Sequence, residues 1–162
     1  MKLTALIMAL VIAAGMACAA QFPKAEDVLA EFTQNAGKVS QEQKGGTTFY
    51  VARNATGVVT KVAYLKYARG YKGQIAIVAI VVKNGASLAF ESVRLVEGKS
   101  KYKEATNGRD AAFMQQFAGK AADKDTQQLQ LDAMTGATKT SRAIMRALDQ
   151  ERANLRALFG LK

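Results

Sequence analysis

The sequence predicts an α+β fold, a single domain in which an antiparallel sheet has flanking helices and the chain ends in a long C-terminal helix. Residues 75–82 form a continuous apolar run, as expected of a strand covered on both faces. Asn84-Gly85 directly after it favours a two-residue hairpin turn, because both residues tolerate positive φ. A helix is predicted from about Ser141. Its apolar stripe consists of Ile144, Leu148, Leu155 and Leu158.

A helix, a loop and two strands are predicted before the apolar run. The helix follows Pro23, and Gly37 is its predicted end. Its apolar residues are Ala25, Val28, Leu29 and Phe32. The polar residues 38–46 are predicted to form a loop. Residues 47–52 and 58–68 are rich in β-branched and aromatic side chains and are predicted to be strands.

The second half of the chain alternates short elements with loops. The return strand, residues 86–95, changes its alternation at Glu91-Ser92, which predicts a bulge or the end of regular pairing. Residues 99–107 are predicted to be a loop, and 110–117 a short helix that Gly119 ends. A short strand over 128–131 and a loop over 132–140 are predicted to precede the final helix.

The first twenty residues predict a secretory signal peptide, which leaves residues 21–162 as the domain. Lys2 gives a basic start, 5–15 is apolar, and the small residues 17–20 suit cleavage. Cleavage implies a periplasmic or other extracytoplasmic protein. Two alternatives stay open. The segment could remain as an anchor on the outer face of the inner membrane, or Cys18 could be a lipoprotein cysteine, although its neighbours fit a lipobox poorly.

The composition excludes several kinds of catalytic and metal site. The sequence has no His and no Trp, and its single Cys, Cys18, lies in the predicted signal. The domain therefore has no imidazole for Ser-His or Cys-His catalysis, no thiolate for an iron–sulfur cluster or covalent haem, and no usual zinc ligand set. Any redox chemistry must reside in an organic cofactor.

The strongly basic charge limits the choice of partner. The formal charge of +10 falls to +9 when Lys2 leaves, because residues 1–20 contain no acid. This surplus suits an acidic protein or anionic lipid, or else a surface tuned for solubility. The basic residues are spread along the chain without interleaved aromatics, and export disfavours nucleic acid. We therefore expect no nucleic-acid partner, and membrane contact only if the N-terminal segment is retained.

Small and hydroxyl-bearing residues are concentrated between Asp132 and Ser141. Gly136 allows close backbone approach, and Thr135, Thr138 and Thr140 offer hydroxyls. The start of the following helix adds free N–H groups and partial positive charge, so the segment suits a phosphate. The alternative is an ordinary helix start capped by Thr140 or Ser141.

The segment Asp132-Ala-Met-Thr-Gly-Ala-Thr138-Lys-Thr-Ser resembles the flavinylation motif of the FMN-binding domain family. That family includes the G subunit of Rnf complexes and the C subunit of sodium-translocating NADH:quinone oxidoreductases. Two upstream segments, 70–73 with its hairpin and 114–120, are similar to the family's Gly-Tyr-x-Gly and Gln-Phe-x-Gly-Lys stretches. One departure is that residues 97–103 replace the family's Glu-Thr-Pro-Gly.

The resemblance implies a covalent FMN that a flavin transferase attaches through its phosphate to the hydroxyl of Thr138. It places Thr135, Gly136, Ala137 and Thr140 around the phosphate. It gives Asp132 a role in the transfer reaction or in orienting the loop. Tyr71 could lie near the flavin, although an aromatic residue beside a buried strand is more often part of the core.

The resemblance implies an exported electron carrier with a redox donor and a redox acceptor protein as partners. The alternative is a non-redox basic module that binds an acidic protein or anionic lipid. A flavin-dependent reductase with its own substrate is less favoured, because the chain has no His and no recognisable substrate domain. We therefore expect an electron-transfer domain more than a stand-alone enzyme.

Overall fold

The structure is a computed structural model that describes residues 22–71, 73–97, 109–133 and 137–161. Its elements in chain order are α1 (Ala25–Asn35), β1 (Lys38–Lys44), β2 (Thr47–Arg53), β3 (Val59–Gly70), β4 (Gly73–Asn84), β5 (Ser87–Val96), α2 (Arg109–Gln115), the 3-10 helix η1 (Thr126–Leu129), α3 (Thr138–Asp149) and α4 (Arg152–Leu158). The predicted signal peptide and the predicted loop at 99–107 lie outside the described residues. None of the described helices has the length and apolar character needed to cross a membrane.

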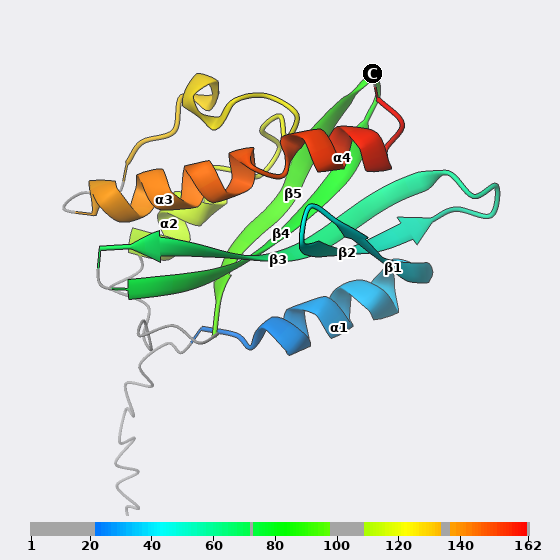
Figure 1. Cartoon of the computed structure of the whole chain (residues 1–162), viewed down its shortest axis with the longest axis horizontal. Helices are drawn as coiled ribbons and strands as arrows, with labels where there is room; N and C mark the ends of the chain where they lie inside the picture. The colour runs from blue at the N-terminus through cyan, green and yellow to red at the C-terminus, as the bar shows by residue number, and fades with distance from the viewer. Residues whose placement is uncertain (1–21, 72, 98–108, 134–136, 162) are drawn as a thin grey trace, which may run out of the picture.

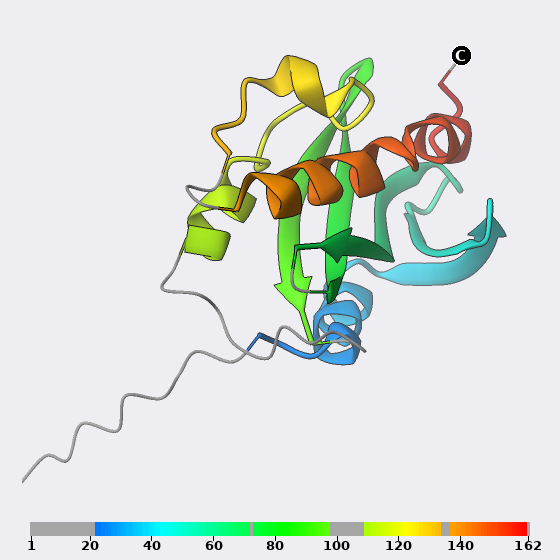
Figure 2. The ribbon, with the colours of Figure 1, turned by 60° about the vertical axis from the view of Figure 1, so that its left-hand side comes forward.

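The sheet is a five-stranded antiparallel meander in the order β1-β2-β3-β4-β5, so each strand pairs with its neighbours in sequence. The helices α3 and α4 cross one face of the sheet and α1 covers the other (Figures 1 and 2). The predicted α+β fold is thereby confirmed. Two helical layers enclose a sheet whose central strands are hidden from solvent on both sides.

Strand β4 contributes to a separate apolar core on each side of the sheet. Ile75 and Ile77 belong to the core that includes residues of α3, whereas Ala76 and Val78 belong to the core that includes residues of α1. All four are buried. This explains why residues 75–82 are apolar without alternation, and it confirms the interpretation of this run.

The change of alternation in the return strand is a β-bulge. Ile80 pairs with Ser92 and Val81 pairs with Phe90, so Glu91 is the extra residue on β5. Of the two predicted alternatives, the bulge is confirmed, and regular pairing does not end here. The extra residue restores the apolar side chains that follow, Val93 and Leu95, to the α3 side of the sheet.

The prediction of a loop over residues 38–46 was wrong, because Lys38–Lys44 forms the edge strand β1. Its side chains are polar and mostly exposed, so no apolar alternation marks it in the sequence. The strand is stabilised by backbone pairing with β2, for example between Ser40 and Val51. Polar and charged side chains are typical of an edge strand, which must not pair with other chains.

The prediction of a strand over residues 128–131 was also wrong, because this region contains η1. The Asp125 carboxylate accepts a hydrogen bond from the backbone N–H of Gln127 (2.9 Å) and caps the 3-10 turn. Gln130 then adopts a positive φ of 51°, which no strand residue takes. The alternating Leu129 and Leu131 were too short a signal to separate a strand from a turn.

The final helical segment begins earlier than predicted and contains a break. α3 begins at Thr138, and after Gln150 and Glu151 the chain continues as α4. The predicted apolar stripe is buried against the sheet as Ile144, Leu148, Leu155 and Leu158. The long C-terminal helix is thus confirmed in position and in the face it buries.

A buried carboxylate at the break joins the helices to the sheet. Glu151 is 1% exposed and accepts hydrogen bonds from Thr47 Oγ1 (2.9 Å) and Asn154 Nδ2 (2.8 Å). It also pairs with the Lys66 ammonium. Burial, together with the nearby Glu151 and Asp149 carboxylates, raises the pKa of Tyr64 far above its ordinary value, so this phenol stays protonated.

Candidate functional site

The attachment residue of the motif, Thr138, is the first residue of α3 and its side chain is exposed. The N-cap is Ala137, whose methyl side chain cannot accept a hydrogen bond. Thr140 and Ser141 lie inside the helix and are buried, so the alternative of a start capped by either residue was wrong. The start of α3 therefore exposes a hydroxyl and has no side-chain cap.

The turn between β3 and β4 lies against the start of α3. The backbone N–H of Tyr71 donates a hydrogen bond to Thr140 Oγ1 (3.2 Å). Gly70 permits this approach, because a Cβ at that position would lie 3.1 Å from the same oxygen. The structure thus brings the Gly-Tyr-x-Gly segment into contact with the motif, about seventy residues later in the chain.

The Tyr71 side chain lies on the surface beside the motif. It is 70% exposed, so the alternative that it belongs to the core was wrong. The Lys139 ammonium lies 5.5 Å from the centre of its ring, in the geometry of a cation–π contact. An aromatic ring and a cation therefore flank the start of α3 on the side of the β3–β4 turn.

The beginning of the motif is fixed by a side chain from the end of α2. Gln116 Nε2 donates to the backbone carbonyl of Asp132 (3.1 Å), and Gln116 Oε1 accepts from the backbone N–H of Asp132 (2.8 Å). The Asp132 side chain is exposed. This role of Gln116 was not predicted, although the residue stands in the Gln-Phe-x-Gly-Lys stretch that carried part of the resemblance.

The structure brings together Ala137, Thr138, Thr140 and Tyr71 around one end of α3. Asp132 is held by Gln116 at the end of α2. Thr135 and Gly136, the other predicted site residues, lie outside the described residues. The Thr140 hydroxyl is buried and accepts the hydrogen bond from the Tyr71 N–H. Only the backbone of Thr140 is therefore available to a ligand at the helix start.

A groove of about 480 Å³ runs along α3 from Thr138, between the helix and the segment containing η1. Its lining includes Thr138, Arg142, Met145 and Arg146 from α3, and Leu131 and Ala133 from the opposite segment. Arg142 and Arg146 are exposed. Neither takes part in any of the ion pairs in the described part of the chain. No sequence pattern indicates that these two residues share a groove with Thr138.

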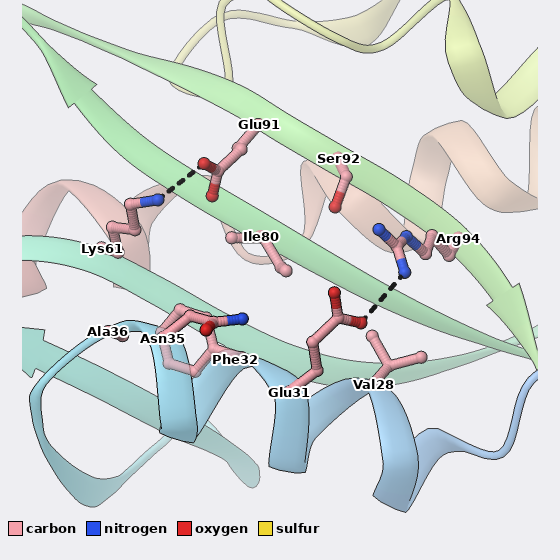
Figure 3. A pocket seen from close by; sticks show the side chains of 10 residues that line it. All are labelled: Val28, Glu31, Phe32, Asn35, Ala36, Lys61, Ile80, Glu91, Ser92 and Arg94. Atoms are coloured by element: carbon pink, nitrogen blue, oxygen red, sulfur yellow. Dashed lines mark hydrogen bonds and ion pairs between the residues drawn. The ribbon is translucent and has the colours of Figure 1, made fainter.

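A second hollow, of about 250 Å³, lies on the opposite face of the sheet beside α1 (Figure 3). Two ion pairs cross it, Lys61–Glu91 (2.6 Å) and Arg94–Glu31 (3.5 Å), with Ile80 between them. Each of these cations thus faces a carboxylate within the protein. This hollow lacks the uncompensated positive charge of the groove along α3, so it is less suited to a phosphate.

Comparison with known proteins places the site in a family. The sequence matches no curated protein. It matches the FMN-binding domain over residues 43–151, more than half of the chain. This range contains the sheet from the end of β1, the β3–β4 turn, Gln116 and the whole motif at the start of α3. The match, together with the fold and site, identifies the chain as a member of the FMN-binding domain family, a flavoprotein whose cofactor is FMN.

Proposed function

We propose that this protein is an exported electron carrier whose FMN is bonded through its phosphate to the hydroxyl of Thr138 by a flavin transferase. The observation that carries the proposal is the position of Thr138. Its side chain is exposed at the first residue of α3, inside the matched region and at one end of the groove. A transferase can therefore reach the hydroxyl in the folded protein.

The charges at the start of α3 fit a phosphate. The helix has no acidic residue in its first turn, whereas Lys139 and Arg142 lie close to its N-terminus. Cations there oppose the helix dipole and cost stability. The first intrahelical backbone bond runs from Ser141 N–H to Ala137 (3.0 Å), which leaves the earlier N–H groups without partners in the helix. A phosphate would neutralise the charge of the cations and accept hydrogen bonds from the N–H groups.

The remaining motif residues support attachment in different ways. The Asp132 backbone is held by Gln116, which leaves its exposed carboxylate available for the transfer reaction. Ala137 is the N-cap residue directly before Thr138. Thr140 contributes its backbone, and its hydroxyl holds the Tyr71 turn in place beside the phosphate.

A role in electron transfer follows from the chemistry available to the chain. Bound FMN supplies the redox chemistry. The domain contains no His, and Cys18 precedes it, so the protein's part is to hold the flavin and adjust its potential. A covalent bond keeps the cofactor attached in the periplasm, where free flavin is scarce. The partners would be the transferase, a redox donor and a redox acceptor.

The test is the intact mass of the mature protein from its native host, with in-gel flavin fluorescence after complete denaturation. We expect a mass excess of one FMN less one water. Thr138→Ala should lose the excess and the fluorescence completely, whereas Thr138→Ser, which keeps a hydroxyl, should retain attachment. If the wild-type protein carries no flavin in cells that contain the transferase, the covalent proposal is wrong.

The uncompensated Arg142 and Arg146 also favour a second function, a non-redox module that binds an acidic protein or an anionic lipid surface. Such a module would keep the fold and remain colourless. It becomes the preferred function if Thr138 proves to be unmodified.

A further inference from the structure

We propose that the redox partner of this protein is an acidic protein that docks on the exposed side of α3, over a stripe of three cations. The stripe consists of Lys139, Arg142 and Arg146. This inference rests on the proposed attachment of FMN at Thr138, and it adds the docking surface and the charge of the partner. Its support is the arrangement of the three cations, the state of their charges and their position beside Thr138.

The three cations follow one another along the side of α3 that faces away from the sheet. The side that packs against the sheet consists of buried residues, which are Thr140, Ser141, Ile144, Ala147 and Leu148. Lys139, Arg142 and Arg146 are exposed, and successive members are three and four residues apart, so they share one flank of the helix. Like charges at these spacings destabilise a helix, because they repel one another. The fold gains nothing from the stripe, which indicates a role toward another molecule.

The next helix shows how this fold neutralises cations. In α4, Arg152 lies 3.6 Å from both the Asp125 and the Asp149 carboxylates, and Arg156 lies 3.6 Å from the Asp123 carboxylate. The residues of the stripe take part in none of the ion pairs formed within the described ranges. The fold thus supplies carboxylates to the cations of α4 and leaves those of the stripe to an external partner.

Flavin attachment leaves most of the positive charge of the stripe in place. FMN bonded through its phosphate to the Thr138 hydroxyl forms a phosphodiester, which carries one negative charge against the three cations. The acid on α3, Asp149, accepts hydrogen bonds from Thr126 N–H (2.9 Å) and Thr126 Oγ1 (2.7 Å) and pairs with Arg152, so its charge is already engaged. The flavinylated helix therefore still presents a positive field, which attracts an acidic surface.

The position of the stripe favours a redox protein over a lipid surface. The stripe begins directly after Thr138, so a partner that covers it also covers the attachment point. Electron transfer slows steeply with distance, so a carrier must dock by its flavin-bearing end. Tyr71, 70% exposed and 5.5 Å from the Lys139 ammonium, adds an aromatic side chain of the kind enriched in protein interfaces. An anionic lipid surface would match the charge, but it has no redox group.

Ionic strength tests whether docking is electrostatic. Two haem proteins of opposite charge serve as probes, the acidic soluble domain of cytochrome b5 and the basic cytochrome c. In each reaction two cytochromes take one electron each from reduced FMN, and the protons of the reduced flavin pass to solvent. Stopped-flow absorbance of the haem gives the second-order rate constant. We expect it to fall roughly tenfold for cytochrome b5 between about 0.01 M and 0.15 M salt, and to rise for cytochrome c.

Charge reversal locates the docking surface. Arg142→Glu/Arg146→Glu should lower the rate constant with cytochrome b5 by roughly tenfold or more at low salt, and the difference should vanish at high salt. Lys38→Glu/Lys83→Glu makes the same change in net charge at two exposed lysines outside the described ion pairs. Lys83 lies roughly 33 Å along β4 from Gly73, which follows the β3–β4 turn. This control should keep most of the wild-type rate.

Two further measurements separate docking from other effects of the variants. Rate constants are expressed per attached flavin, so that incomplete attachment does not count as weaker docking. An uncharged quinone as oxidant reports the intrinsic reactivity of the reduced flavin, and the cytochrome rate constants are compared after division by this value. Arg146→Glu alone serves as a second variant, because Arg146 lies further along the helix from Thr138 than Arg142 does. It should lower the rate constant with cytochrome b5 in the same direction.

Three outcomes contradict the inference in different ways. Equal losses in the stripe and control variants would mean that net charge alone governs the rate. Binding to phosphatidylglycerol vesicles that depends on Arg142 and Arg146, without such dependence for cytochrome b5, would assign the stripe to a lipid surface. A wild-type chain without FMN in the intact mass refutes attachment at Thr138, and this inference with it. A flavinylated chain whose Arg142→Glu/Arg146→Glu variant keeps the wild-type rates refutes only the docking surface.

Discussion

The two faces of the sheet carry charge in different ways. On the α1 face, the cations that line the hollow of Figure 3 are paired across it, Lys61 with Glu91 and Arg94 with Glu31. On the α3 face, Arg142 and Arg146 line a groove and form none of the described ion pairs. The difference teaches that total charge does not locate a ligand site. The cations left for a ligand are those that the fold does not neutralise.

The largest expected effect concerns the buried pair beneath the α3 face. Glu151→Leu leaves the Lys66 ammonium, with a side chain only 20% exposed, without its carboxylate. We expect a loss of about 3 kcal/mol in the free energy of unfolding, since breaking a buried pair is strongly destabilising. Urea denaturation measures it. The double variant Lys66→Met/Glu151→Leu should recover much of the loss. If Glu151→Leu alone lowers the free energy of unfolding by less than about 1 kcal/mol, the Lys66–Glu151 pair contributes no more to stability than an exposed ion pair does.

An intermediate effect is expected at the contact between α2 and the motif. Gln116→Met removes both hydrogen bonds to the Asp132 backbone, so we expect a loss of about 1 kcal/mol in stability. It should also slow flavin attachment by the transferase, because the loop leading to Thr138 loses its fixed start. The neighbouring, exposed Gln115→Met is the matched control. Equal attachment rates for the two variants would show that Gln116 supports only the fold.

The smallest effect is expected on the α1 face. Lys61 and Glu91 have side chains 40% and 43% exposed, so Glu91→Gln should change stability by less than about 1 kcal/mol. The remaining difference should vanish in concentrated salt, which screens exposed charges. Thermal unfolding at two salt concentrations tests this. A large loss that persists in salt would mean that the pairs of Figure 3 are structural, and the contrast between the faces would weaken.

The elements predicted correctly are those whose signal lies in their own residues. Residues 75–82 of β4 are apolar because both faces of this part of the strand are covered, and the bulge at Glu91 appears as a change of alternation. β1 was missed because its polar side chains give no pattern, and its partner β2 provides the stabilising hydrogen bonds. Residues 128–131 were misassigned because capping by Asp125 and the contact between Thr126 and Asp149 determine that turn.

The candidate site divides in the same way. Asp132 and Thr138 could be proposed as site residues because the motif is contiguous in the sequence. Two features of the site depend on how α2, η1 and α3 pack, so no local pattern reveals them. They are the two hydrogen bonds between Gln116 and the Asp132 backbone, and the groove shared by Thr138 and Arg146. Tyr71 could not be assigned to core or surface from sequence, because a turn residue beside a buried strand is compatible with both.

The hydrogen bond between Thr47 and Glu151 has a consequence for how this domain can be combined with others. The family match begins four residues before Thr47 and ends at Glu151, so the two ends of the matched region meet in space. A unit whose ends lie close together can be inserted into a loop of another protein without stretching either chain. A unit carried in this way would have to include α4 as well, because Leu155 and Leu158 belong to the same core as the sheet.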